Sequence, residues 1–279
     1  MPEGHTLRRL ADGIAGRFAG QVVAVASPQG RFADSAAVLD RTLLTGAESW
    51  GKHLFVAFEG DRFVHVHLGL YGTFDLADGP APPPVGQVRL RLEATGAQPT
   101  YGDLRGATAC ELFTDDQRRA VLSRLGPDPL RAEAQWTRAW DRVRRSKAPV
   151  GALLMDQAVL AGVGNVYRAE VLFRHRLHPM RPGSTLRRGQ FEALWLDLAH
   201  LMAEGVRTGR IDTVRPEHEP DAMGRPPRRD TRGGEVYVYR RSGQACLVCG
   251  SRVRTEVLAA RNLFWCPRCQ PRFRSRAGG

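Results

Sequence analysis

The first eighteen residues, Met1-Pro2-Glu3-Gly4 followed by HTLRRLADGIAGRF (residues 5–18), decide how the fold begins. Apolar residues recur there every three or four positions, while the remaining positions carry arginine and aspartate. This spacing predicts an amphipathic helix whose apolar stripe packs on a core. The stripe consists of Leu7, Leu10, Ala11, Ile14 and Phe18. Such a helix would hold Pro2 and Glu3 at one fixed place.

Pro2 is a candidate nucleophile, provided that Met1 is removed. An N-terminal α-amino group titrates at a pKa of ~7.7–8.0, well below that of lysine, so part of it is unprotonated near neutral pH. The secondary amine of proline can then attack an aldehyde-level carbon and form an iminium ion, a Schiff base. Glu3 is a candidate general acid/base beside it. The alternative is that Met-Pro is simply a permitted start and Glu3 an ordinary acid at a helix N-terminus.

The charge of the chain predicts a polyanionic partner, with nucleic acid as the first candidate. The 279 residues carry a formal net charge of +12, and a basic surface gains free energy by releasing counterions from phosphates. Only Lys52 and Lys147 among the 41 basic residues are lysines, so arginine dominates. A genome rich in G and C would give the same bias. Because no apolar run reaches the ~18 residues of a membrane span and no signal peptide is evident, we expect a soluble, cytoplasmic protein.

Four of the five cysteines predict a metal site. They form two Cys-x-x-Cys pairs separated by sixteen residues, namely Cys246, Cys249, Cys266 and Cys269. This is the spacing of a four-thiolate zinc site, in which a filled coordination shell makes the metal structural. The segment between the pairs is predicted to form a β-hairpin that zinc stabilises. Disulfides are the alternative, and Cys110 is expected to be a small buried residue.

The pattern along the chain predicts an α+β protein. From Gly20 to about Phe113, short runs with period two alternate with turn signals, which favours a β-sandwich or barrel. Two prolines interrupt regular structure in the run 125–130, and beyond it the spacing is helical. Residues 211–234 lack periodicity and are predicted to be a mobile loop. We therefore expect a catalytic helix and β-sandwich domain over 1–128, a helical domain over 129–234 and a zinc finger over 235–279.

Four further stretches are candidate sites, each with a plain structural alternative. Lys52 stands at a strand entry after Gly51, where it is either a phosphate or catalytic lysine or a surface residue. Leu70 and Tyr71 occupy a predicted turn, from which they can wedge into a base stack if they are exposed. Asn165 is expected to cap a helix, either as a cap alone or at an N-terminus that binds a phosphate. Arg261, near the hairpin tip, is either a phosphate ligand or one more solvated arginine.

Taken together, these residues resemble the formamidopyrimidine-DNA glycosylase/endonuclease VIII family, and the resemblance covers essentially the whole chain. The motifs that carry it, in order, are Pro2-Glu3, Gly51-Lys52-His53, the run 67–72, Asp103-Leu104-Arg105, the run 125–130, the run 154–170 and the four terminal cysteines. The family implies an N-terminal β-sandwich with its helix, a helix–two-turn–helix domain and a zinc-finger hairpin. It also implies one structural zinc and double-stranded DNA with oxidised bases or abasic sites as partner.

The activity that the resemblance implies is that of a bifunctional base-excision DNA glycosylase and AP lyase. Pro2 matches the family's nucleophile, Glu3 the general acid/base and Lys52 the catalytic lysine near the phosphate. Asn165 and Arg261 match the phosphate-binding pair. Glu170 also matches a family position, with a supporting role. A flipped-out base leaves a gap in the stack, so gap-filling residues are required.

The gap-filling residues separate two branches of this family. The formamidopyrimidine branch commonly uses a methionine from a first loop and an arginine and a phenylalanine from a second. Here Leu70 and Tyr71 occupy the first loop, as in endonuclease VIII, while Arg105 matches the arginine and Ala107 stands in the place of the phenylalanine. Two further departures from the family pattern are Gly69 and His5. The opening Met-Pro-Glu-Gly also resembles the endonuclease VIII branch, of actinobacterial type, which favours oxidised pyrimidines.

Two alternatives to this activity stay open. One is 8-oxoguanine and formamidopyrimidine specificity, and the other is a catalytically silent protein that binds damaged DNA. The resemblance further implies β,δ-elimination at the abasic site. We expect a monomer that associates with the bacterial nucleoid through DNA and has no membrane partner.

Overall fold

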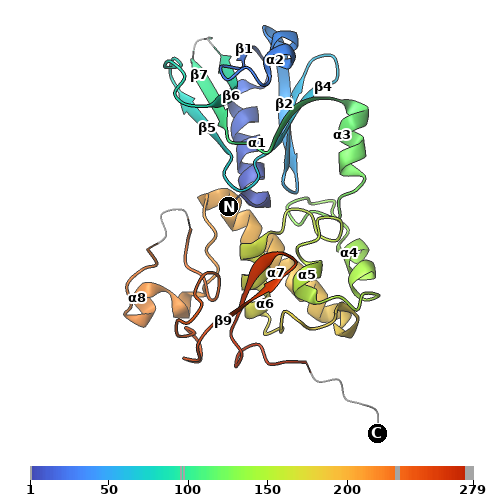
Figure 1. Cartoon of the computed structure of the whole chain (residues 1–279), viewed down its shortest axis with the longest axis vertical. Helices are drawn as coiled ribbons and strands as arrows, with labels where there is room; N and C mark the ends of the chain where they lie inside the picture. The colour runs from blue at the N-terminus through green and yellow to red at the C-terminus, as the bar shows by residue number, and fades with distance from the viewer. Residues whose placement is uncertain (1, 95, 97, 230–232, 274–279) are drawn as a thin grey trace. The chain divides into compact units, whose positions relative to one another are not determined.

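The computed structural model describes residues 2–94, 96, 98–229 and 233–273, which form two compact units, residues 1–124 and 125–279 (Figure 1). Each unit has its own core of buried apolar side chains. In the described part of the chain, no helix has the length and apolar character needed to cross a membrane. The finer division at residues 128 and 234 stays a prediction.

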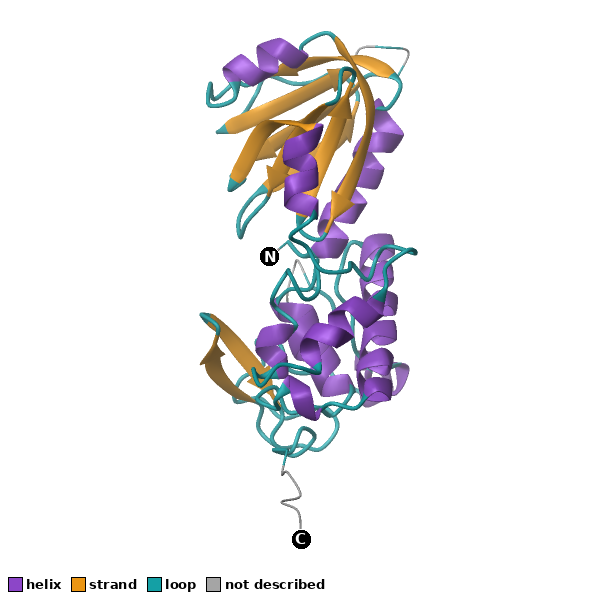
Figure 2. Cartoon of the chain, turned by 90° about the vertical axis from the view of Figure 1, so that its right-hand side faces the viewer, coloured by secondary structure: helices purple, strands orange, loops and turns teal. Residues whose placement is uncertain are grey.

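The first unit is a β-sandwich with a long N-terminal helix (Figure 2). Its strands are β1 (Gln21–Ala26), β2 (Thr42–Trp50), β3 (His53–Phe58), β4 (Arg62–His67), β5 (Thr73–Asp78), β6 (Val88–Ala94), β7 (Thr100–Arg105) and β8 (Ala109–Thr114). The first half of β1 pairs with β2 and its second half with β6. One layer therefore runs β1-β2-β3-β4-β8 and the other β5-β7-β6-β1, with β1 shared. The predicted sandwich is confirmed.

Helix α1 (Gly4–Phe18) packs against β2, β3 and β5. The predicted stripe is its buried face, since Leu7, Ala11, Ile14 and Phe18 are each at most 1% exposed. At the C-terminal end of α1, Arg17 Nε donates to Asp78 Oδ1 over 3.1 Å. Because α1 runs along the sandwich (Figure 1), Pro2 to Gly4 lie at the end opposite Asp78.

That opposite end of the sandwich, here called the loop end, carries the turn 51–52 and the loops 68–72 and 106–108. Strand register places them there: Trp50 pairs with His53, and His67 pairs with Ala109. Arg105 pairs with Thr73 in one neighbouring strand and with Val88 in the other. The N-terminus of α1 and these loops therefore share one end of the unit.

Two helices of the first unit were not predicted. Helix α2 (Ala33–Leu39) interrupts the run that the sequence had favoured as strands, with Ala36 and Leu39 buried. Helix α3 (Asp115–Leu122) follows β8 and begins with a capping box. Thr114 Oγ1 accepts from Gln117 N, and Thr114 N donates to the Gln117 side chain. The Thr-x-x-Gln spacing is a sequence signal for this start.

The second unit is helical, as predicted. Its helices are α4 (Trp136–Val143), α5 (Val150–Leu153), α6 (Asn165–Arg174), α7 (Arg188–Thr208) and α8 (Pro220–Met223), with short 3-10 turns at Gly183–Thr185 and Pro216–His218. Helix α5 has only four residues. The apolar face of α7 is buried in the core of the unit. Residues 211–229, part of the predicted mobile loop, contain the short helix α8. Residues 230–232 of the predicted mobile loop lie outside the described residues.

Helix α6 is the centre of the second unit, and Glu170 ties it to two other segments. The Glu170 carboxylate is fully buried and accepts from the backbone N–H groups of residues 237, 238 and 239 over 2.7 to 2.9 Å. It also accepts from Thr213 Oγ1 over 2.7 Å. Four donors compensate the loss of water around this buried charge. Glu170 is thus a structural residue of the second unit, and its supporting role in the activity stays a prediction.

The C-terminal hairpin, β9 (Arg254–Leu258) and β10 (Arg261–Trp265), shares the core of the helical unit. Phe264, Val253 and three of the four metal-site cysteines belong to the same apolar cluster as α6 and α7. The Gln270 side chain, fully buried, donates to Leu177 O and accepts from Cys266 N, each over 2.9 Å. The finger is therefore integrated with the helices.

We predict that Glu170→Gln destabilises the second unit by about 3 kcal/mol or more. The glutamine side chain has no charge, and its NH2 group would face N–H and O–H donors that now bond to the carboxylate. Chemical denaturation followed by circular dichroism measures this. Glu192→Gln, on the exposed face of α7, is the matched control and should leave the free energy of unfolding almost unchanged. Equal stability of the two variants would contradict the role given to Glu170.

Candidate active site and nucleic-acid interface

Pro2 and Glu3 precede α1 at the loop end. Pro2 is half-buried, and Glu3 is fully buried at the N-cap position of the helix. The Glu3 carbonyl accepts from Thr6 N over 2.9 Å, whereas its side chain makes no capping bond to the helix. His5, in the first turn, is buried, and burial lowers its pKa to about 4. A buried carboxylate that does not cap its helix is unusual and marks Glu3 as a candidate for chemistry.

Lys52 lies in the tight turn between β2 and β3, where Gly51 adopts a φ of +59°. The histidines beside it form a cluster: His53 stacks on His65, with 2.9 Å between Nδ1 and Nε2, and the tilted rings of His53 and His67 are 5.3 Å apart. Burial, with a further effect of the neighbouring charges including Lys52, lowers the pKa of His53 to about 3. The pKa of His67 is lowered by burial and by Lys52. These imidazoles are neutral near pH 7, so the local positive charge is that of Lys52 and Arg124.

Leu70 and Tyr71 are exposed in the loop 68–72, by 44% and 87% respectively. The structure therefore places them as a wedge requires, rather than in the core. Gly69 has a φ of +69°, and a Cβ there would lie 1.9 Å from Thr108 Oγ1. The positive φ and this close approach favour glycine at position 69.

Arg105 is the last residue of β7, at the loop end, and its guanidinium donates to groups of the protein itself. Its Nη2 lies 2.8 Å from Asp103 Oδ2 and its Nη1 lies 3.2 Å from Asp75 Oδ2, while its Nε donates to Val85 O over 3.2 Å. Asp103 is buried and also binds Arg91 through both oxygens. These charges hold the pKa of Asp103 below its usual range despite burial. The contact of Arg105 with DNA stays a prediction.

In the second unit, Asn165 and Arg261 come together. Asn165 is the first residue of α6, and Gly164 rather than Asn165 occupies the N-cap position, which corrects the predicted cap. Asn165 Nδ2 donates to Asn262 O over 2.9 Å, and its Oδ1 accepts from Arg168. Arg261, the neighbour of Asn262, is exposed at the start of β10. The start of α6 and the hairpin tip thus present one surface.

The four cysteines fit a zinc ion. Their sulfur atoms all lie within 4.8 Å of one another, with 3.9 Å between Cys246 and Cys269 and 3.4 Å between Cys249 and Cys266. A tetrahedral site with Zn–S bonds of ~2.3 Å requires sulfur separations of about 3.8 Å. The site holds one structural zinc. Among the described residues, this is the one group of three or more potential ligands so arranged.

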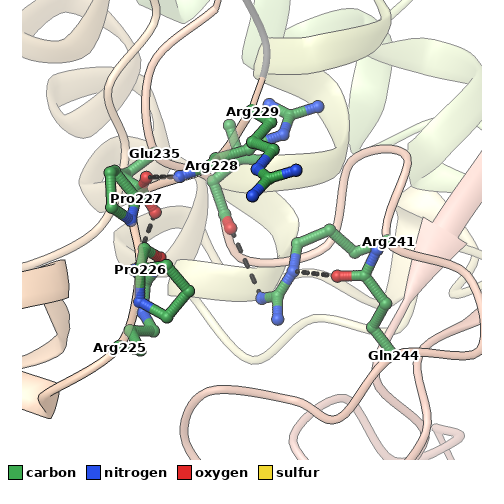
Figure 3. A pocket seen from close by; sticks show the side chains of 9 residues that line it. Arg225, Pro226, Pro227, Arg228, Arg229, Glu235, Arg241 and Gln244 are labelled. Atoms are coloured by element: carbon green, nitrogen blue, oxygen red, sulfur yellow. Dashed lines mark hydrogen bonds and ion pairs between the residues drawn. The ribbon is translucent and has the colours of Figure 1, made fainter.

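Sequence reasoning did not find a basic cavity beside the finger (Figure 3). It has a volume of about 310 Å³ and is lined by Arg225, Pro226, Pro227, Arg228, Arg229, Glu235, Val236, Arg241 and Gln244. Glu235 lies 2.7 Å from Arg225 and accepts from Arg228 N. Arg241 Nη1 donates to Tyr237 O over 2.8 Å. The charges of Glu235, Arg225 and Arg241 are therefore engaged in contacts within the cavity wall. The Pro-Arg composition of 225–229 was the available signal.

The structure thus gathers the sequence-predicted residues in two groups. Pro2, Glu3, Lys52, Leu70, Tyr71 and Arg105 lie at the loop end of the first unit, and Asn165, Arg261 and the four cysteines lie in the second. Sequence reasoning missed the packing of His53 on His65, since strand register decides it. A β-sandwich with an N-terminal helix, followed by a helix–two-turn–helix unit with a four-cysteine zinc hairpin, defines the structural class.

Known families and proteins match this class along the whole chain. The formamidopyrimidine-DNA glycosylase N-terminal domain matches residues 1–110, its H2TH domain residues 125–216, and the zinc finger found in FPG and IleRS residues 243–272. "Endonuclease 8 1" of Mycobacterium tuberculosis is 54% identical over 275 residues, covering 97% of this chain and 100% of that protein. The formamidopyrimidine-DNA glycosylase of Thermus thermophilus is 33% identical and covers 97% of each chain.

The chain belongs to the formamidopyrimidine-DNA glycosylase/endonuclease VIII family. The fold agrees with solved structures of Lactococcus lactis Fpg. One of them, a complex with DNA containing an abasic site, matches with a TM-score of 0.75 at 22% identity, over 97% of this chain and 100% of that one. The family resemblance read from the sequence is confirmed.

We predict that Cys266→Ser removes zinc and unfolds the hairpin, because the ligand set loses a thiolate and the hairpin depends on the metal. The zinc content per chain, by atomic spectroscopy, should fall from about one to near zero. Cys110→Ser, which changes the remaining cysteine, should keep its zinc. Near-UV circular dichroism reports the hairpin core around Trp265. An unchanged spectrum after verified zinc loss would refute the structural role.

Proposed function

We propose that this protein is a bifunctional base-excision DNA glycosylase and AP lyase that removes oxidised bases through a Schiff base on Pro2. Membership of the family and 54% identity to a protein named Endonuclease 8 1 support an enzyme of this type. The single observation that carries the chemistry is the placement of Pro2 and the buried Glu3 at the end of the sandwich that also holds Lys52.

The proposed reaction needs only groups of the protein, the substrate and water. The Pro2 nitrogen bonds to the deoxyribose C1′ as the C1′–N glycosidic bond breaks, and the departing base gains a proton. Opening of the sugar ring leaves an iminium ion. Loss of the C2′ proton then expels the 3′ phosphate, and a second proton loss expels the 5′ phosphate, which is β,δ-elimination. Water finally hydrolyses the iminium and frees Pro2.

Glu3 and Lys52 are proposed to serve this sequence in different ways. Glu3, adjacent to the amine and shielded from bulk water, carries protons to and from the sugar. Lys52, in its glycine-preceded turn, holds the phosphate next to the reacting sugar. The histidines beside Lys52 are neutral near pH 7, so the positive charge that attracts the phosphate comes from Lys52 and the nearby Arg124.

Double-stranded DNA containing an oxidised base or an abasic site is the proposed partner. Asn165 and Arg261, on their common surface, bind backbone phosphates, and zinc keeps the hairpin in place for this contact. Flipping the damaged nucleotide costs a few kcal/mol and leaves a gap that Leu70 and Tyr71 fill, with Arg105 beside them. We further propose that the protein acts as a monomer in the bacterial cytoplasm, associated with the nucleoid through DNA.

Oxidised pyrimidines are the favoured substrates, because the exposed Leu70-Tyr71 pair follows the endonuclease VIII pattern and Ala107 lacks the phenylalanine of the other branch. Specificity for 8-oxoguanine and formamidopyrimidines is the second candidate. It is favoured by Arg105, which matches the other branch.

We predict that sodium borohydride traps a covalent complex with abasic-site DNA, because it reduces the iminium to a stable amine. Gel electrophoresis measures the adduct. Protein that keeps Met1, verified by intact mass, has no Pro2 amine and should bind the same DNA without being trapped. A silent damaged-DNA-binding protein would bind and never be trapped, which would overturn the proposal.

The base preference is tested with duplexes carrying thymine glycol, 5-hydroxyuracil or 8-oxoguanine, each opposite its normal partner. We expect kcat/KM for excision of the two pyrimidines to exceed that for 8-oxoguanine by about tenfold or more, a difference of about 1.4 kcal/mol in transition-state binding. Faster excision of 8-oxoguanine would assign the protein to the other specificity while leaving the Schiff-base mechanism intact.

A further inference from the structure

The segment 79–87 between β5 and β6 presents an exposed apolar residue that has no assigned role. It contains Pro80 and the run Pro82-Pro83-Pro84, followed by Val85. Prolines lack a backbone N–H and have a fixed φ, so this stretch is stiff and does not join the sheet. The Val85 side chain is 75% exposed. An exposed valine at the end of a stiff segment is a candidate residue for contact with a partner.

Strand register shows where the segment leads. It begins after Asp78, which pairs with Thr100, and it ends at Val88, which pairs with Arg105. Thr100 and Arg105 are the two ends of β7, so residues 79–87 run back along this strand. They arrive at the loop end, where the loops 68–72 and 106–108 also lie. Val85 therefore reaches the end of the sandwich where DNA is proposed to bind.

Two hydrogen bonds fix the backbone of the segment, and a third joins one of its side chains to the preceding part of the chain. Arg91 Nη1 donates to Pro82 O over 2.6 Å, and Arg105 Nε donates to Val85 O over 3.2 Å. Gln29 Nε2 donates to the Gln87 side chain over 2.7 Å. Because the backbone is already held, Val85 can meet a partner with little further loss of conformational entropy.

Val85 and the Leu70-Tyr71 turn flank the same two residues. Arg105 binds the carbonyl of Val85, and the next residue, Gly106, lies against the Tyr71 backbone: a Cβ on Gly106 would be 3.4 Å from Tyr71 O. The position that follows is Ala107, whose methyl group offers little apolar surface. The exposed apolar side chains around Arg105 and Gly106 are therefore Leu70, Tyr71 and Val85.

We propose that Val85 is a specificity-determining residue that packs on the base stack beside the gap left by the everted nucleotide. It supplies the apolar contact that Ala107 does not. This inference rests on the proposed function, since the gap exists only when a base is flipped. An apolar side chain inserted at a disrupted base step compensates for lost stacking. The basic charge of the chain suits the phosphates on either side.

The test compares binding to two duplexes that are identical except for one site. One carries a tetrahydrofuran abasic analogue, which provides the gap and resists cleavage, and the other is undamaged. Val85→Ser should weaken binding to the tetrahydrofuran duplex about fivefold to tenfold, the effect of losing one partly buried aliphatic contact. Binding to the undamaged duplex should change by less than about twofold. Val85→Leu should retain the preference for the gapped duplex.

Val22→Ser is the matched control, because Val22 is 59% exposed on β1 near the end of the sandwich opposite the loop end. It should leave both affinities unchanged. Equal behaviour of Val85→Ser and Val22→Ser, or equal weakening on both duplexes, would overturn the inference. Wild-type protein that neither prefers the gapped duplex nor forms a borohydride adduct would instead refute the proposed function. Thermal unfolding confirms that each variant is folded.

Discussion

The packing of α1 into the β-sandwich is the constraint on which the rest of the first unit depends. Leu7, Ala11, Ile14 and Phe18 are almost completely buried, and burial of each large apolar side chain contributes about 1.5–3 kcal/mol. Chain termini are usually among the least ordered parts of a protein. Here the residues before the helix lie at a defined end of a rigid body. If Pro2 is the nucleophile, as proposed, its amine meets the substrate without a large ordering cost, as proximity in catalysis requires.

The second unit solves a different problem, that of holding a small hairpin against a helix. Glu170 accepts four hydrogen bonds, one from Thr213 and three from the backbone of residues 237–239. Gln270 connects the cysteine site to Leu177. The four thiolates add a zinc ion to these contacts. A hydrogen bond from Asn165 to the Asn262 carbonyl then joins the start of α6 directly to the hairpin tip. The phosphate contacts proposed for Asn165 and Arg261 would therefore come from a fixed surface.

The sequence predicted those features that depend on local spacing. The helical stripe of residues 7–18, the two Cys-x-x-Cys pairs and the order of the loops all follow from residue patterns. Features that depend on long-range register were not predictable. The stacking of His53 on His65 and the return of the proline segment to Arg105 require knowledge of which strands are neighbours. Helix α2 was missed because seven residues are too few to display a period. The prediction that Asn165 is the N-cap of α6 was wrong by one position, because Gly164 is the N-cap residue. The roles of Pro2, Glu3 and Lys52 remain predictions.

The scarcity of lysine allows a direct test of the central claim that Pro2 is the nucleophile. With Met1 removed, the chain offers three amines, at Pro2, Lys52 and Lys147. The measurement is peptide mass mapping of the borohydride-trapped complex with abasic-site DNA, after digestion of protein and DNA. The account predicts the added sugar on the peptide that begins at Pro2, with both lysine-containing peptides unmodified. A sugar found on Lys52 or Lys147, with Pro2 unmodified, would contradict it.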